Sequence, residues 1–431
     1  MSKITYFIFV LLSITVSTTV SQCNNETIMN NIQSIFGNLV SPPTIPNLQN
    51  LSSTPIPIND TEYKVENKTY IYTTRPTQTV APTSACECIP YYLCKENGTL
   101  NMDGEGLFTI RIDDEDDKTE CPHYLLQCCP KTNISSTVIL PKPLPKRKGC
   151  GYRRPKGIAI NVDPHRNQAK YGELPWMIAV FTQDLAGDNK TENYKCGGAL
   201  IHPKAVLTAA HCIENDLHYI IRAGEWDTKT NLEIYPHENV AVKEKIIHEH
   251  FYYGGLHNDV AILILEREIP YKDHIDVICL PPQDFVPDDN SGCIASGWGK
   301  KNFEKHEQYQ TILKKINLPF VERNRCQDWL RTTRLGPYFM LDKSLVCAGG
   351  RKGEDTCEGD GGSPLVCPIP GQLDIYYQIG MVAWGIDCGN EVPAAYVNVA
   401  LFRNWIDDVM KKNNLDWMAY EHLPISVRID D

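Results

Sequence analysis

Cys357-Glu358-Gly359-Asp360-Gly361-Gly362-Ser363-Pro364-Leu365-Val366-Cys367 is the stretch that decides the fold. In this stretch a glycine-rich segment, expected to form a tight turn, lies between two cysteines. In acyl-transfer enzymes the backbone amides of such a turn bind the oxyanion, and a side chain of the turn attacks the substrate. The central position here is Gly361, which has no side chain. The function therefore depends on what accompanies this turn elsewhere in the chain.

Two upstream segments carry the residue types that would complete a catalytic site. Leu207–Cys212 puts His211 at a predicted strand end, and His257–Leu263 puts Asp259 just ahead of an apolar strand. The order of histidine, aspartate and nucleophile turn matches one known order of the catalytic triad. In a triad the imidazole takes the nucleophile's proton and the buried carboxylate fixes its tautomer. A lone histidine or aspartate at a strand end is usually structural, but three such segments in order predict a triad.

Residues 150–412 resemble the chymotrypsin/trypsin-like serine protease domain. The resemblance rests on Ala209-Ala210-His211-Cys212, Asn258-Asp259-Val260-Ala261, Ser296-Gly297-Trp298-Gly299 and Ala383-Trp384-Gly385, besides the turn. It implies an all-β fold of two six-stranded antiparallel β-barrels with a C-terminal helix and the site in the cleft between the barrels.

The pattern of apolar residues independently predicts a barrel or sandwich. Short β-branched and apolar runs recur between turn signals; they include Met177–Phe181, Ala205–Thr208, Tyr219–Ala223, Val260–Leu265, Leu313–Val321 and Tyr376–Trp384. The helical spacing of Phe402, Trp405, Ile406, Val409 and Met410 predicts the C-terminal helix. The polar tail of residues 413–431 is expected to be loose.

The turn departs from the family pattern at the nucleophile. The family has Gly-Asp-Ser-Gly-Gly-Pro where this chain has Gly-Asp-Gly-Gly-Ser-Pro, so Gly361 replaces the nucleophile. Without the hydroxyl there is no acyl-enzyme chemistry. Ser363 lies two residues further on, a displacement that moves its hydroxyl out of reach of His211. We therefore predict a non-enzyme with a degenerate triad.

Three further departures accompany this one. The family's Ile-Val-Gly-Gly start is absent from Gly157–Asp163, so Asp360 would lack its ammonium partner and a zymogen-like arrangement is expected. Ala383 stands where the family has a serine that hydrogen-bonds the triad carboxylate. The remnant of the family's specificity pocket keeps Gly385 and Asp355, which matches the residue that selects basic substrate side chains. Ala394 replaces a glycine on the wall of this pocket, and its methyl group is expected to narrow the slot for the substrate side chain.

The N-terminal half has the composition of a secreted protein. Residues 1–21 contain a basic start, an apolar run from Tyr6 to Val16 and small residues, as in a signal peptide. Seventeen cysteines suit an oxidising compartment. The apolar run is shorter than the roughly 20 residues of a membrane span, so no span is expected. The net charge of −11 argues against nucleic acid as a partner.

Residues 22–85 are rich in proline, threonine, asparagine and serine, which predicts a flexible glycosylated segment. Residues 130–149 predict a linker. Its prolines make it stiff, and the basic residues between Lys142 and Lys148 make it cleavable. The sequons of the whole chain are at Asn25, Asn50, Asn59, Asn67, Asn97, Asn133 and Asn189.

Residues 86–129 hold six cysteines in a block too small to be stabilised by a core alone. Six cysteines allow fifteen pairings, and spacing does not choose among them. A zinc site is the rival interpretation, which the adjacent Cys128-Cys129 disfavours. Between the third and fourth cysteines, Arg111 lies beside the acidic run Asp113–Asp117. A basic residue in such a loop is a candidate cleavage site for a trypsin-like protease.

Cys88–Cys94 and Gly106–Ile112 resemble the clip domains of arthropod protease homologues that act in prophenoloxidase activation. The clip resemblance implies the pairs Cys86–Cys128, Cys88–Cys121 and Cys94–Cys129. The protease resemblance implies Cys150–Cys279, Cys196–Cys212, Cys293–Cys367, Cys326–Cys347 and Cys357–Cys388. Cys23 is left over, either free or linking two chains.

One acidic loop resembles the family's calcium loop. Glu225, Asp227 and Glu238 are the candidate ligands, since carboxylates that close one loop suit a hard cation. A plain acidic surface loop is the alternative. No cofactor is otherwise expected.

The chain as a whole resembles the clip-domain serine protease homologues. The resemblance implies a secreted, catalytically inactive cofactor or scaffold in the prophenoloxidase (melanisation) cascade of arthropod innate immunity, located in the haemolymph and switched by cleavage. Prophenoloxidase and clip-domain proteases are the implied partners, with a homo-oligomer as a candidate state after cleavage. Two alternatives stay open: an active secreted trypsin-like endopeptidase that uses Ser363, and a microbial-surface recognition protein.

Overall fold

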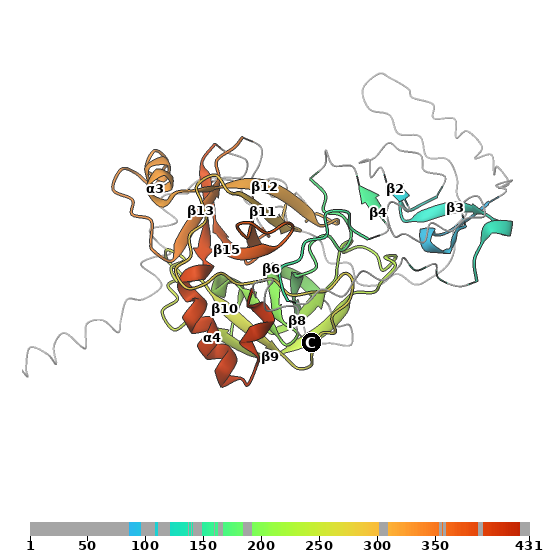
Figure 1. The fold of residues 1–431 in the computed structure, drawn as a ribbon, viewed down its shortest axis with the longest axis horizontal. Coiled ribbons are helices and arrows are strands. Elements are labelled where there is room, and N and C mark those ends of the chain that lie inside the picture. Colours follow the sequence, from blue (N-terminus) through green and yellow to red (C-terminus); the bar gives the residue numbers. More distant parts are fainter. Residues whose placement is uncertain are drawn as a thin grey trace, which may run out of the picture. The chain divides into compact units, whose positions relative to one another are not determined.

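The computed structural model describes a protease-like domain and the clip domain that precedes it in the chain (Figure 1). The described residues are 86–95, 108–110, 121–136, 138, 140, 149–158, 160–162, 167–183, 192–300, 309–352, 356, 359–386 and 391–422. All of them belong to one compact unit, Ala81–Asp431. None of the helices in this described part is long and apolar enough to cross a membrane.

The first barrel closes in the order β10-β7-β6-β5-β8-β9, and every pair is antiparallel. Its strands are β5 (Met177–Gln183), β6 (Glu192–His202), β7 (Ala205–Thr208), β8 (His218–Ala223), β9 (Glu238–Ile247) and β10 (Ala261–Leu265). The apolar run of β10 is buried along its whole length, as expected of a strand covered on both faces. Irregular register at Val180/Phe181 and Ile264/Leu265 helps the strands to bend around the barrel.

The second barrel closes in the order β11-β12-β13-β16-β15-β14, again with antiparallel pairs. Its strands are β11 (Gly292–Gly297), β12 (Lys314–Val321), β13 (Leu345–Gly349), β14 (Pro364–Pro368), β15 (Tyr376–Trp384) and β16 (Pro393–Asn398). Helix α3 (Arg323–Arg331) connects β12 to β13, and Glu322 caps it by accepting from the amides of Asn324 and Arg325. The predicted two-barrel all-β fold is confirmed.

The C-terminal helix is confirmed as α4 (Arg403–Lys412), which follows the 3-10 turn η5 (Val399–Phe402). Ile406, Val409 and Met410 form its buried face, and two lysines in its last turn complement the helix dipole. The expectation of a loose tail is wrong for residues 413–422. The tail turns back through η6 (Trp417–Tyr420), and Tyr420 is wholly buried because it packs against α4.

The clip domain is built on a two-stranded antiparallel sheet of β1 (Cys86–Pro90) and β3 (Leu126–Pro130). Each strand leads into a short 3-10 turn, η1 (Tyr91–Leu93) and η2 (Lys131–Asn133). The amide of Lys95 donates to Asn133 and that of Ser135 donates to Leu93. These bonds join the first residues after the predicted boundary at residue 129 to the clip domain.

A second small sheet joins two segments that are distant in sequence. Strand β2 (Phe108–Ile110) pairs in parallel with β4 (Ile160–Val162). No pattern in the sequence predicts this pairing. It links the clip domain's loop to the segment that precedes the first barrel.

The described residues contain seven disulfides, and each joins a pair that the family resemblance implies. They are Cys86–Cys128, Cys88–Cys121, Cys94–Cys129, Cys150–Cys279, Cys196–Cys212, Cys293–Cys367 and Cys326–Cys347. The eighth implied pair, Cys357–Cys388, lies outside the described residues, as does Cys23.

Candidate functional site

The first barrel brings two of the predicted triad residues together. His211 lies in the 3-10 turn η4 (Ala210–Cys212) just after β7, and Asp259 lies just ahead of β10. The carboxylate of Asp259 is wholly buried; its Oδ2 is 2.6 Å from Nδ1 of His211, and its Oδ1 accepts the backbone amide of His211 at 2.7 Å. This arrangement holds the imidazole in the orientation that a general base requires.

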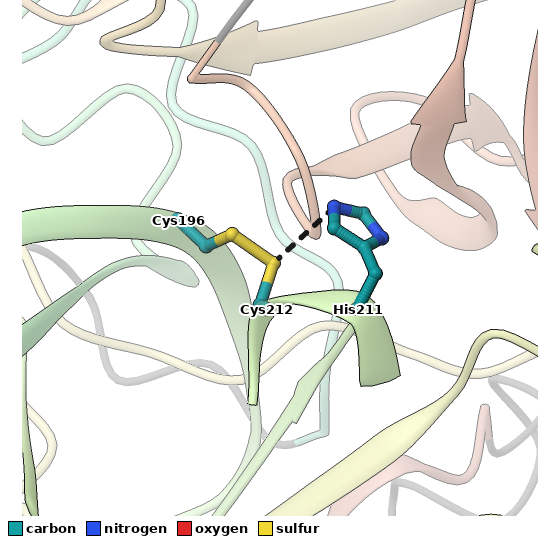
Figure 2. A group of neighbouring side chains, drawn as sticks. All are labelled: Cys196, His211 and Cys212. Carbon is teal, nitrogen blue, oxygen red and sulfur yellow. Dashed lines mark hydrogen bonds between the residues drawn. A yellow bond between two sulfur atoms is a disulfide. The ribbon is translucent and has the colours of Figure 1, made fainter. Parts of the chain in front are cut away.

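The other ring nitrogen of His211 faces the turn. Figure 2 shows the imidazole beside the Cys196–Cys212 disulfide. Its Nε2 lies 3.6 Å from Sγ of Cys212. A Cβ atom placed on Gly361 would lie 2.7 Å from Nε2, closer than real Cβ atoms come to other heavy atoms. The imidazole therefore occupies the space that a side chain at position 361 would need.

The serine of the turn points elsewhere. Ser363 is wholly buried, and its side chain fills the space beside Gly197 of β6, where an added Cβ would overlap its hydroxyl oxygen. A Cβ on Gly297, at the end of β11, would lie 3.1 Å from the same oxygen. The Ser363 hydroxyl is thus packed between strands of the two barrels.

The turn itself is fixed by backbone hydrogen bonds. The amide of Gly197 donates to the carbonyl of Gly361 at 2.9 Å, and the amide of Gly362 donates to Val382 at 3.0 Å. Gly362 has a φ of +74°, and a Cβ there would overlap the Thr208 hydroxyl, so only glycine fits. The amide of Gly299 donates to the Asp360 carboxylate at 2.8 Å.

The pocket remnant is only partly described. Asp355 lies outside the described residues. Ala394 is buried in β16, where it pairs with Ala348 of β13. Gly385 follows β15 directly, and Ala383 near the end of β15 is half-buried against the core. Whether Ala394 narrows a slot stays a prediction.

The three candidate calcium ligands have different partners. Glu238 pairs with Lys272 at 2.6 Å and Arg267 at 3.1 Å, and the hydrogen bond from Lys272 lowers its pKa. Glu225 pairs with Arg222 at 3.3 Å and with His237 at 3.2 Å. The wholly buried Asp227 accepts the Thr230 hydroxyl at 2.9 Å.

Within the described part of the chain, only Cys196, His211 and Cys212 have metal-ligand spacing, and both sulfurs belong to a disulfide.

The carboxylate next to Asp227 is Glu233, which is not among the predicted ligands. Glu233 accepts the Asp227 amide at 2.9 Å. Burial and the charge of Glu225 raise the pKa of Glu233 to about 8. Calcium at Glu225, Asp227 and Glu238 stays a prediction, and Glu233 is a further carboxyl group of the same loop.

The clip domain contacts this acidic loop. The Tyr124 hydroxyl donates to the carboxylate of Asp227, and Nε2 of His123 lies 3.7 Å from the same oxygen. Burial and this hydrogen bond raise the pKa of Tyr124, so the hydroxyl stays a donor. Tyr91 and Leu125 of the clip domain are buried in the same apolar cluster as Trp226 and Ile234. Sequence reasoning missed this contact, although the tyrosines lie within the six-cysteine block.

Several predicted sites lie outside the described residues. They are the cleavage candidate Arg111 and the sequons at Asn25, Asn50, Asn59, Asn67, Asn97 and Asn189. The remaining sequon residue, Asn133, is half-buried at the end of η2, and its side chain accepts the Thr132 hydroxyl at 3.2 Å.

The comparisons with known proteins agree with this geometry. The family model described as "Trypsin" matches residues 164–406, and the model "Serine protease Clip domain PPAF-2" matches residues 75–130. Phenoloxidase-activating factor 2 of Galleria mellonella is 45% identical over 294 residues, which is 66% of this chain and 97% of that protein. The inactive CLIP domain-containing serine protease A8 of Anopheles gambiae is 37% identical over 326 residues, 74% of this chain and 87% of that protein. The inactive CLIP domain-containing serine protease A28, also of Anopheles gambiae, is 33% identical over 340 residues, which is 74% of this chain and 88% of that protein.

Proposed function

The chain belongs to the trypsin family of serine proteases and carries a clip domain, and on this premise we propose that it is a secreted, catalytically inactive cofactor in prophenoloxidase activation. The names of its relatives, a phenoloxidase-activating factor and inactive clip-domain proteases, support this role. A partner-binding scaffold needs the protease fold and its disulfides but not the nucleophile.

The observation that carries the proposal is the relation of Gly361 to His211. The dyad of His211 and Asp259 keeps its hydrogen bonds, but a Cβ at position 361 would lie 2.7 Å from Nε2. A protease cannot form an acyl-enzyme without a nucleophile at hydrogen-bond distance from its base. The buried position of Ser363 opposes the alternative in which that residue attacks instead.

The test of inactivity uses the full-length secreted protein, before and after cleavage by a trypsin-like protease that is then removed. Arg-containing ester substrates report turnover, and a serine-directed covalent probe reports a reactive hydroxyl. We expect neither turnover nor labelling above that of a buffer control. Turnover that is abolished by Ser363→Ala would instead establish an active peptidase.

The test of the cofactor role is reconstitution. Prophenoloxidase and its activating protease are combined with and without this protein, intact or pre-cleaved, and phenoloxidase activity is measured. We expect cleaved protein to raise the activity. If activity is unchanged while the protein is pulled down on microbial polysaccharide, a surface-recognition role replaces the one proposed.

We further propose that cleavage near Arg111 is the switch. The residue directly follows β2, in the loop between Cys94 and Cys121 of the clip domain. A cut there would leave both halves of the clip domain joined by its disulfides while freeing the ends of the loop. Terminal sequencing of the activated protein locates the cut, and a sole cut between Lys142 and Lys148 would refute the Arg111 site.

A further inference from the structure

The glycine-rich turn is held in the uncut chain by a residue that lies far from it in sequence. Tyr194 lies in β6, two residues before Cys196, and its hydroxyl donates to the carbonyl of Gly359 at 2.9 Å. Burial of that hydroxyl and the nearby charge of Asp360 raise the pKa of Tyr194 well above its usual value. The phenol therefore remains a hydrogen-bond donor throughout the physiological range.

The ring of Tyr194 is itself fixed by aromatic neighbours. Its centroid lies 5.8 Å from that of Phe181, 6.3 Å from Trp298 and 5.3 Å from Tyr309, each in an edge-to-face arrangement. Tyr309 also packs on Gly359, where φ is +95° and an added Cβ would overlap the Tyr309 ring. The aromatic rings of Phe181 in β5 and of Trp298 and Tyr309 after β11 thus fix the position of the phenol ring.

The other side of the turn is held by the second barrel. The Asp360 carboxylate accepts the Gly299 amide at 2.8 Å, and an added Cβ on Gly299 or Gly297 would overlap that carboxylate. The Gly197 amide, three residues after Tyr194, donates to Gly361 at 2.9 Å. Tyr194 and Gly197 from the first barrel and Gly299 from the second therefore fix three consecutive residues of the turn.

We infer that Tyr194 is a positioning residue that sets the turn of residues 359–362 in the uncleaved chain, so that proteolysis does not remodel it. The zymogen-like arrangement expected from the missing activation start is the alternative that this inference opposes. A cleavage signal must then act through other parts of the molecule. The inference concerns only the turn, so it holds or fails independently of the proposed role in prophenoloxidase activation.

Hydrogen exchange of the full-length protein tests the inference directly. The amide of Gly362 donates to Val382 of β15 and that of Ser363 donates to Asp360 of the turn, so their exchange rates report the order of the turn. We expect less than a twofold difference in these rates before and after cleavage by a trypsin-like protease. Exchange that slows tenfold or more on cleavage would overturn the inference, wherever the cut lies.

Tyr194→Phe removes the hydroxyl and keeps the ring, and we expect the two amides to exchange about tenfold faster in the uncut variant. Tyr309→Phe is the matched control, since Tyr309 belongs to the same cluster and is 43% exposed. Equal rates in Tyr194→Phe and Tyr309→Phe would refute the positioning role. If Tyr194→Phe is not secreted, the wild-type comparison before and after cleavage still decides whether proteolysis remodels the turn.

Discussion

The hydroxyl of Tyr124 donates a hydrogen bond to the carboxylate of Asp227, which is wholly buried. The two residues are 103 positions apart, one in the clip domain and the other in the acidic loop of the first barrel. Asp227 also accepts the Lys229 amide at 3.1 Å and the Thr230 hydroxyl at 2.9 Å. The contact therefore ties the clip domain to a loop that is itself rigidly hydrogen-bonded.

Tyr124→Phe should loosen this contact. Removing one donor from a buried charged acceptor costs about 1–3 kcal/mol, so we expect a lower thermal transition and faster limited proteolysis of the clip domain. Tyr253→Phe is the matched control, because Tyr253 is 74% exposed. Equal thermal transitions and equal rates of proteolysis in the two variants would show that this hydrogen bond does not hold the clip domain on the acidic loop.

Gly361→Ser should not restore a protease. The added Cβ would displace His211, whose Nδ1 holds Asp259 at 2.6 Å. We expect no ester hydrolysis and a loss of about 1–3 kcal/mol of stability through overpacking. Gly292→Ser is the control, since a Cβ there meets nothing within 4 Å. Hydrolysis by Gly361→Ser would show that the imidazole moves freely and that only the hydroxyl is missing.

The free energy of unfolding should depend on pH because of the titration of Glu233. Its native pKa is about 8 against an ordinary 4.5, so between these values the folded protein binds more protons than the unfolded chain. Stability contributed by this group is therefore present at low pH, falls by up to roughly 1.4 kcal/mol per pH unit across the window, and levels off above pH 8. Denaturant unfolding from pH 5 to 8.5 in a chelator measures it.

Two variants make this assignment specific. Glu233→Gln should flatten the slope between pH 5 and 8. Glu238→Gln should leave it unchanged, because the Lys272 hydrogen bond lowers the pKa of Glu238 and places its titration below this window. Calcium added at pH 8 should stabilise the protein by mass action if the loop binds it. An unchanged midpoint on calcium addition would remove the calcium prediction.

Local motifs allowed the sequence to predict the fold and the dyad. His211 and Asp259 each lie at the end of a predicted strand, and the pairing of β7 with β10 in the first barrel brings them together. Glu238 stays an untested candidate ligand at the acidic loop, but the partner of its side chain could not be predicted from the sequence. Counting carboxylates along the loop selected Glu238, but its side chain pairs with Lys272, more than thirty residues further on. Spacing does not reveal such a partner.

Contacts between distant segments were beyond prediction for the same reason. The pairing of β2 with β4, the Tyr124–Asp227 contact and the role of Tyr194 all depend on side chains or edges that meet only after the barrels close. The tail was misjudged because its sequence is polar overall. Residues 413–422 are held by contacts with distant residues, among them the buried ring of Tyr420 and the arginine that lies over it.

Tyr420→Ala should therefore destabilise the protein strongly. Tyr420 is wholly buried, its hydroxyl donates to Asp407 at 2.7 Å, and the Arg403 guanidinium lies 5.1 Å from its ring centroid. Truncating a buried aromatic residue costs about 3–5 kcal/mol, which equilibrium unfolding measures. Trp417→Ala is the control in the same turn, since Trp417 is 38% exposed and should lose about 1 kcal/mol at most. Equal losses would mean that the tail contributes through its backbone bond from Leu280 to Tyr420 and not through the buried ring.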